Sequence, residues 1–257
     1  MLALPDQRQC ALFRLRRLMI LLWAFFPLMA FAQSDADFAR ANEEFAQGHF
    51  QEAIAGYEAL VSAGQWNPNL FYDLGNAYFR TNDFGRAILN YERALALDRH
   101  HPEARANLQI ARDEARALEL QPSRLERYLH LASANQYSLV AAVDFWLMIF
   151  AFAAMIFARR RSPALLALSV CCLLTCAFAA WATYVLEYGN EGRALAIIIG
   201  KDVQARLATA DTANSVLALP PGSEIKILST RGDWIYAALP NDLRGWIPAK
   251  HAEQVRL

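Results

Sequence analysis

Few residues of this chain have the types and the spacing that catalysis or metal binding requires. His100 and His101 form the nearest approach to a pair of metal ligands. Adjacent side chains at a helix end point apart, and the helix dipole explains histidines there without a metal. The chain has no Gly-rich phosphate loop, no His-Glu-x-x-His, no Cys-x-x-Cys and no Gly-x-Ser-x-Gly turn. We therefore expect no catalytic residue, no metal ligand, no cofactor and no enzyme activity.

Without catalytic residues, we expect the protein to act by binding other molecules. Its composition limits which classes of partner are expected. Lys and Arg total 25, as do Asp and Glu, so no net charge favours a nucleic acid. Cys171, Cys172 and Cys176 lie inside an apolar run, where thiols behave as small apolar side chains. Acylation or metal binding by these three is the alternative, although sulfurs without other ligand types rarely form a site. A hydrophobic content of 56% in 257 residues indicates one or two small domains plus membrane segments.

Two apolar runs determine where the rest of the chain lies. They extend from Leu139 to Ala158 and from Ala164 to Leu186. Each has about the 20 helical residues that a bilayer core of about 30 Å requires. The connection between them contains three consecutive arginines, 159–161, which the positive-inside rule places in the cytoplasm. The sequence therefore predicts transmembrane helices over 139–158 and 164–186, with both flanking parts outside the cytoplasm.

The N-terminal segment agrees with this orientation. Four arginines between positions 8 and 17 precede an apolar core from Leu18 to Phe31, and Ala30-Phe31-Ala32 has the form of a cleavage site. We predict a signal peptide over residues 1–32. The alternative is an uncleaved anchor helix, which also places the following residues outside the cytoplasm.

Asp144 is the only formal charge inside the first apolar run. A membrane-embedded acid is a functional candidate by default, but the second run offers no basic partner. Because Asp144 lies only a few residues from the outer end of the run, contact with water and burial in a helix bundle are both open. The preceding segment, 122–138, mixes Leu and Tyr with charged residues and is predicted to lie at the membrane surface.

The N-terminal part repeats itself with a period of 34 residues, the length of a helix-turn-helix unit. The matching pairs are Phe50/Phe84, Ala53/Ala87, Ile54/Ile88, Tyr57/Tyr91 and Glu58/Glu92. Asn69 to Leu97 resembles a tetratricopeptide repeat, with the Leu-Gly and Tyr of the first helix and the Ala, Tyr and Ala of the second. A weaker copy over 38–61 precedes it, and Pro102 begins a third copy that continues as a polar capping helix. We predict a repeat domain over 34–121 with two repeats and a cap.

The resemblance to tetratricopeptide repeats implies that the inner faces of the first helices line a groove that receives peptides. Amides at this spacing bond an extended backbone, and an arginine pairs with a carboxylate. A solvated or interhelical face is the alternative, and both interpretations stay open. The implied groove residues are Asn42, Asn69, Tyr72, Asn76, Phe79 and Arg80.

The periodicity changes over 193–257, where short runs rich in branched and aromatic residues alternate with turn signals. The expected strands are Ala194 to Ile199, Val203 to Leu207, Glu224 to Leu228, Trp234 to Leu239 and Gly245 to Ile247. We predict an antiparallel sheet that closes into a small barrel, since closure protects its edges. The second half resembles a bacterial SH3 domain, in which Trp234 and Pro248 match ligand-groove positions. A proline-rich peptide, cell-wall glycan or neighbouring protein as ligand, and simple packing of the tryptophan, all stay open.

The complete order predicts a multidomain membrane protein with a helical tetratricopeptide array, a transmembrane hairpin and a small all-β SH3-like barrel. This order resembles the BatE-like proteins of the bacterial aerotolerance operon. The resemblance implies a non-catalytic scaffold at the bacterial inner membrane, with both exported parts on the extracytoplasmic side. It implies partnership with von Willebrand factor A-type membrane proteins and a MoxR-type ATPase. A peptidoglycan-binding envelope protein is the alternative, and an enzyme with an unrecognised site is a third.

Overall fold

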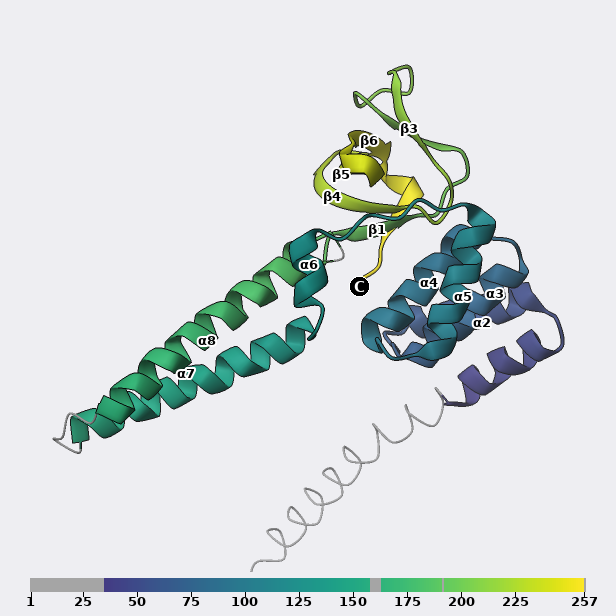
Figure 1. Cartoon of the computed structure of the whole chain (residues 1–257). Coiled ribbons are helices and arrows are strands. Elements are labelled where there is room, and N and C mark those ends of the chain that lie inside the picture. The colour runs from purple at the N-terminus through teal and green to yellow at the C-terminus, as the bar shows by residue number, and fades with distance from the viewer. Residues whose placement is uncertain (1–34, 158–162, 191, 257) are drawn as a thin grey trace, which may run out of the picture.

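The computed structural model describes residues 35–157, 163–190 and 192–256. It contains a set of repeat helices, two long helices and a C-terminal sheet (Figure 1). The two long helices project away from the other two parts, which lie against each other. The predicted signal peptide and the three arginines between the apolar runs lie outside the described residues.

The repeat part consists of antiparallel helices with defined starts. Residues 35–46 form the first helix. The next four are α2 (Phe50–Ser62), α3 (Pro68–Arg80), α4 (Phe84–Leu97) and α5 (Pro102–Ala115). The Asn67 side chain accepts the Leu70 N–H, and the Asp83 side chain accepts the Arg86 N–H. Such caps satisfy N–H groups that the first helical turn leaves free, so the polar residues between the apolar runs set the helix boundaries.

A glycine lets the two helices of the second repeat approach closely. A Cβ atom at Gly75 of α3 would lie 2.7 Å from the ring of Tyr91 on α4. Tyr91 is only 1% exposed, and Ala87 on the same helix is fully buried. The small residues of the repeat pattern therefore make room for the aromatic ring.

The capping helix ends earlier than expected. The predicted repeat domain continues to 121, but α5 ends at Ala115 and Arg116 adopts a left-handed conformation. The next residues run along the sheet, where Leu118 accepts the Glu224 N–H at 2.8 Å and donates to Ser223 Oγ at 3.1 Å. Leu120 is buried in the core of the repeats. Backbone pairing and burial of these leucines favour the extended form over another helical turn.

A short helix joins the repeats to the long pair. Helix α6 (Arg124–Leu129) begins with a capping box between Ser123 and Glu126. Leu129 packs against Ala182 and Leu186 near the end of α8. The segment predicted to lie at a membrane surface therefore packs at the base of the helical hairpin.

The long helices are α7 (Ala134–Phe157) and α8 (Pro163–Tyr188). Both are long and apolar enough to cross a membrane, with mean hydropathies of 2.3 and 2.2. Few of their residues are buried within the protein. They pack on each other through contacts such as Cys176 Sγ to the Ala141 carbonyl, 3.4 Å. Helix α7 starts five residues before the apolar run, so Ala134 and the polar residues 135–138 form its beginning.

The C-terminal sheet is antiparallel and has seven strands in the order β3-β2-β6-β5-β4-β1-β7. The strands are β1 (Leu195–Ile198), β2 (Val203–Arg206), β3 (Ser215–Leu219), β4 (Glu224–Arg231), β5 (Trp234–Ala238), β6 (Arg244–Pro248) and β7 (Ala252–Gln254). Two short 3-10 helices, Pro240–Asp242 and Ala249–His251, flank β6. The end strands β3 and β7 were not among the predicted ones.

The prediction of a closed barrel is wrong, because β3 and β7 remain the two ends of an open sheet. The β7 edge is covered by the repeats instead. Arg93 of α4 donates to Glu253 Oε1 at 2.7 Å and to the Gln254 carbonyl at 3.0 Å. A sheet edge that a helix covers is protected from other strands without closure.

The sheet and the repeats share one hydrophobic core. Leu195, Ile197 and Val255 of the sheet part pack in the same buried cluster as the repeat residues. A Cβ atom at Gly85 of α4 would lie 2.9 Å from the Ile198 carbonyl oxygen. The missing side chain therefore lets α4 dock directly on β1, which fixes the groove side of the repeats relative to the sheet.

Candidate functional site

A hollow of about 260 Å³ opens on the inner face of the repeats. Its walls come from the helix over 35–46, from α3 and α5, and from one side chain of α4. The lining residues are Phe45, Asn76, Phe79, Arg80, Tyr91, Asn107 and Ile110. Because equivalent helices of successive repeats stack side by side, residues at equivalent positions meet at this hollow.

Asn76 is held in one orientation at the hollow. Its Oδ1 atom accepts from the Tyr91 hydroxyl and from Asn107 Nδ2, each at 2.8 Å. Two donors on one oxygen fix the amide plane. The Nδ2 group of Asn76 has no hydrogen bond to another described residue. It is therefore an oriented donor that is available to a ligand.

The same arrangement occurs one repeat earlier. The Tyr57 hydroxyl donates to Asn42 Oδ1 at 2.6 Å, and both residues precede their counterparts Tyr91 and Asn76 by 34 positions. Burial raises the pKa of both tyrosine hydroxyls above the ordinary value, so each stays a protonated donor at neutral pH. The repeat thus conserves its internal tyrosine-to-asparagine bond.

The two units differ at the residue that corresponds to Asn107, the second donor to Asn76. Asp73 stands 34 residues before Asn107, so an acid replaces an amide in the first unit. Burial raises the pKa of Asp73 to about 6, although the nearby His101 acts to lower it. Helix α3 therefore carries an acid, Asp73, near His101 and a cation, Arg80, over the Phe50 ring of α2.

The other walls of the hollow are mainly apolar. Phe45 and Phe79 each contact a further phenylalanine ring at a centroid distance of 5.4 Å. Ile110 is 51% exposed. Arg80 lies over the ring of Phe50, with its guanidinium carbon 4.5 Å from the ring centroid. The arrangement offers oriented donors next to apolar surface.

The six predicted groove residues separate into two groups. Asn76, Phe79 and Arg80 come together in the hollow, whereas Asn42, Asn69 and Tyr72 do not line it. Asn69 is exposed on the first turn of α3. Tyr72 packs near His101, with the two ring centroids 5.0 Å apart.

Four lining residues were not predicted, and the repeat period contains a signal for two of them. Phe45 precedes Phe79 by 34 positions, and Ile110 follows Asn76 by the same interval. Asn107 follows Asp73 by 34 positions, but Asp73 does not line the hollow. Tyr91 was recognised as a repeat residue but was assigned to packing. The sequence does not show that its hydroxyl reaches the inner face.

The two predicted residues of the sheet lie opposite each other. Trp234 of β5 pairs with Pro248 of β6, and both are half-buried. Two register positions away on the same strands, the rings of Tyr236 and Trp246 are 5.0 Å apart. This patch of aromatic residues and proline is separate from the residues that line the hollow.

A second hollow, of about 340 Å³, lies where α2, α3 and α4 meet β7. Its charged groups bond to other groups of the chain. Arg93 contacts Glu253, and the Tyr78 hydroxyl donates to Glu58. Within the described ranges, no cluster of His, Cys, Asp or Glu has the arrangement of a metal site.

Comparisons with known proteins agree with the helical part of this description. The chain is similar to the RNA polymerase II-associated protein 3 of Mus musculus, Rattus norvegicus and Homo sapiens, at 32% identity over 108 residues in each case. The match covers 38% of this chain and only 16% of each of those proteins. Residues 68–101 match the family model of the tetratricopeptide repeat. These residues are α3, α4 and the turn after them, so the helices that carry Asn76 and Tyr91 form a tetratricopeptide repeat.

Proposed function

We propose that this protein is a membrane-anchored scaffold that binds a peptide segment of a partner protein in the hollow of its repeats. Tetratricopeptide repeats are protein-interaction modules, and the family match to 68–101 supports a protein partner. The observation that carries the proposal is the geometry of Asn76. Tyr91 and Asn107 hold its oxygen, and its Nδ2 group stays free beside apolar walls.

The groups at the hollow define the kind of peptide that fits. Asn76 Nδ2 and the Arg80 guanidinium are donors, so the ligand must present acceptors such as backbone carbonyls or a carboxylate. Phe45, Phe79 and Ile110 provide apolar surface for a side chain next to those acceptors. The hollow of about 260 Å³ is large enough to take up an apolar side chain. We infer an extended segment with an apolar residue beside an acceptor group.

The membrane location forms the second part of the proposal. Helices α7 and α8 have the length and hydropathy of membrane spans. The positive-inside rule, applied to arginines 159–161, favours the repeats and the sheet on the extracytoplasmic side of a bacterial inner membrane. The resemblance in domain order to BatE-like proteins supports von Willebrand factor A-type membrane proteins, working with a MoxR-type ATPase, as the partners.

Co-purification from gently solubilised membranes tests the groove. We expect the double substitution Asn76→Ala and Arg80→Ala to lower recovery of the partner at least tenfold, since it removes both free donors. Asn69→Ala is the matched control, because Asn69 is exposed on the same helix and does not line the hollow. Equal recovery with the double variant and with the control would contradict the proposed groove.

The aromatic patch on β5 and β6 favours a second candidate function, binding of cell-wall glycan. Trp234, Tyr236, Trp246 and Pro248 gather on two neighbouring strands, and aromatic faces suit sugar rings. Sedimentation of the full chain with purified peptidoglycan tests this candidate. Trp234→Ala should then reduce sedimentation, whereas Trp66→Ala, on the exposed surface of the repeats, should not. A chain that stays in the supernatant removes this candidate.

A further inference from the structure

Helices α7 and α8 contain two formally charged residues, Asp144 and Glu187. Glu187 lies in the last turn of α8, where Arg193 donates to it and Arg256 Nη1 lies 3.0 Å from its Oε1 atom. Asp144, by contrast, has no hydrogen bond or ion pair to any described residue. Among the described residues, therefore, one acid of the hairpin is neutralised and the other is not.

Asp144 lies well inside helix α7. It lies ten residues after the first residue of α7, which is about 15 Å along the helix at about 1.5 Å per residue. Ser138 Oγ faces Thr183 Oγ1 at 3.4 Å near the base of the hairpin. Asp144 lies six residues, or about 9 Å, beyond that level. Its side chain is too short to return the carboxylate to the base.

The neighbouring helix does not compensate this charge. Between Pro163 and Tyr188 it has no Lys, Arg or His. Thr175 Oγ1 of α8 donates to the Cys171 carbonyl, and Cys176 Sγ contacts the Ala141 carbonyl. Cys172 of α8 interacts electrostatically with Asp144, but a thiol supplies no positive charge. Of the residues one helical turn away from Asp144 on α7, Val140 and Leu147 are exposed and apolar. No described residue of the hairpin therefore supplies a compensating cation, and the exposed apolar surface next to Asp144 is where another molecule can supply one.

We propose that Asp144 forms an intramembrane ion pair with a Lys or Arg in a transmembrane helix of a partner protein. The inference rests on the proposed membrane anchoring of α7 and α8, and it adds a second contact to the groove. Charged residues within membrane spans are costly and are usually paired. A cation at the same depth complements the unpaired carboxylate, and the exposed apolar residues around it provide the packing surface.

Energy transfer in lipid vesicles tests the ion pair. The full chain carries a fluorescent protein at its C-terminus, and the probe is a dye-labelled helical peptide of Leu and Ala with one Lys at the depth of Asp144. The control peptide has Leu at that position. We expect at least fivefold stronger association with the Lys peptide, and we expect Asp144→Asn to abolish the difference, because asparagine keeps the size but not the charge.

Three outcomes would overturn the proposal. Equal association of both peptides would show that no ion pair forms. A preference for Lys that survives in Asp144→Asn would show that a neutral hydrogen bond is sufficient. A homodimer of the chain that is lost in Asp144→Leu would make a second copy the partner. Insertion is measured separately, from the quenching of Trp146 and Trp181 by brominated lipids. Absence of this quenching would contradict membrane anchoring itself.

Discussion

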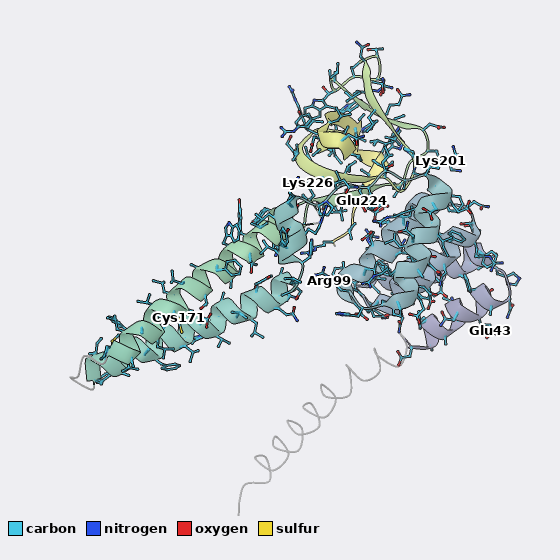
Figure 2. All side chains as sticks on the ribbon, in the orientation of Figure 1. Glu43, Arg99, Cys171, Lys201, Glu224 and Lys226 are labelled. Atoms are coloured by element: carbon cyan, nitrogen blue, oxygen red, sulfur yellow. The ribbon has the colours of Figure 1, made fainter. Side chains whose placement is uncertain are left out.

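The repeat helices use polar residues in opposite ways on the face that meets the sheet and on the inner face. Towards the sheet, Arg112 of α5 contacts Glu92, Glu119 and Glu224, and Glu224 lies at the junction labelled in Figure 2. On the inner face, Asn76 is fixed by its neighbours but keeps a free donor. On the face towards the sheet the polar groups are therefore paired within the chain, whereas on the inner face a donor stays available to a partner.

Arg112 at this junction stays positively charged at all ordinary pH values. Burial alone acts to lower the pKa of Arg112, but the three carboxylates outweigh burial and raise it above the ordinary value. Only 14% of the Arg112 side chain and 7% of the Glu224 side chain are exposed. A buried pair of this kind is costly to break, because each partner left alone is a desolvated charge.

The largest expected effect is the loss of Arg112. We predict that Arg112→Ala lowers the free energy of unfolding of the full chain in detergent micelles by about 3 kcal/mol, since Glu92 and Glu224 lose their cation. Chemical unfolding followed by circular dichroism measures this change.

Glu253→Gln provides the control at the same junction. The Glu253 side chain is 45% exposed, and a glutamine oxygen still accepts from Arg93. We expect a loss below about 0.5 kcal/mol. Equal losses in the two variants would contradict the view that the Arg112 cluster carries the junction.

A smaller effect is expected on the inner face. Tyr91→Phe removes one of two donors to Asn76, from a ring that is 1% exposed. We predict a loss of about 1.5 kcal/mol in the free energy of unfolding, together with weaker partner recovery, because the amide is less well fixed. Tyr128→Phe is the control, since Tyr128 is 75% exposed. Unchanged partner recovery in Tyr91→Phe would argue against an oriented Asn76 donor.

The smallest effect is a pH dependence from Asp73. Its pKa in the folded chain is about 6, above the ordinary value of 3.8, so the folded state binds more protons between these values. Stability from this group should therefore fall as pH rises from about 4 to about 6, by about 1 kcal/mol after allowance for solvent screening.

Asp73→Asn should remove this slope and raise the free energy of unfolding at pH 7. Unfolding midpoints measured at several pH values for the two chains test the sign. Asp211→Asn, at an exposed position of the sheet part, is the control that should keep the slope. A steeper fall in Asp73→Asn would contradict the assignment.

Several features of the fold could be predicted from local patterns. The 34-residue period predicted the repeat helices, and two apolar runs predicted α7 and α8. Alternating branched residues predicted five strands of the antiparallel sheet. Strand β7 was missed because its three residues carry no periodic pattern, and β3, Ser215 to Leu219, was not predicted either.

Half of the candidate site was also within reach of the sequence. Applying the period to α3 places Phe45 and Ile110 beside Asn76. The bond from Tyr91 to Asn76 could not be predicted, because a packing tyrosine and a bonding tyrosine have the same position in the repeat. The packing of α4 against α3 decides whether the Tyr91 hydroxyl reaches Asn76.

The sequence by itself determined the elements that depend on short-range order: the repeat, the two long apolar helices and most strands. Only the tertiary structure decided that the sheet stays open and that the repeats cover its edge. Arg112 and Glu224 are 112 residues apart, and Gly85 meets the backbone of Ile198 across a similar interval. Periodicity reports which face of an element is apolar, whereas these contacts depend on matching shape and charge between distant faces. That complementarity exists only after the elements have packed.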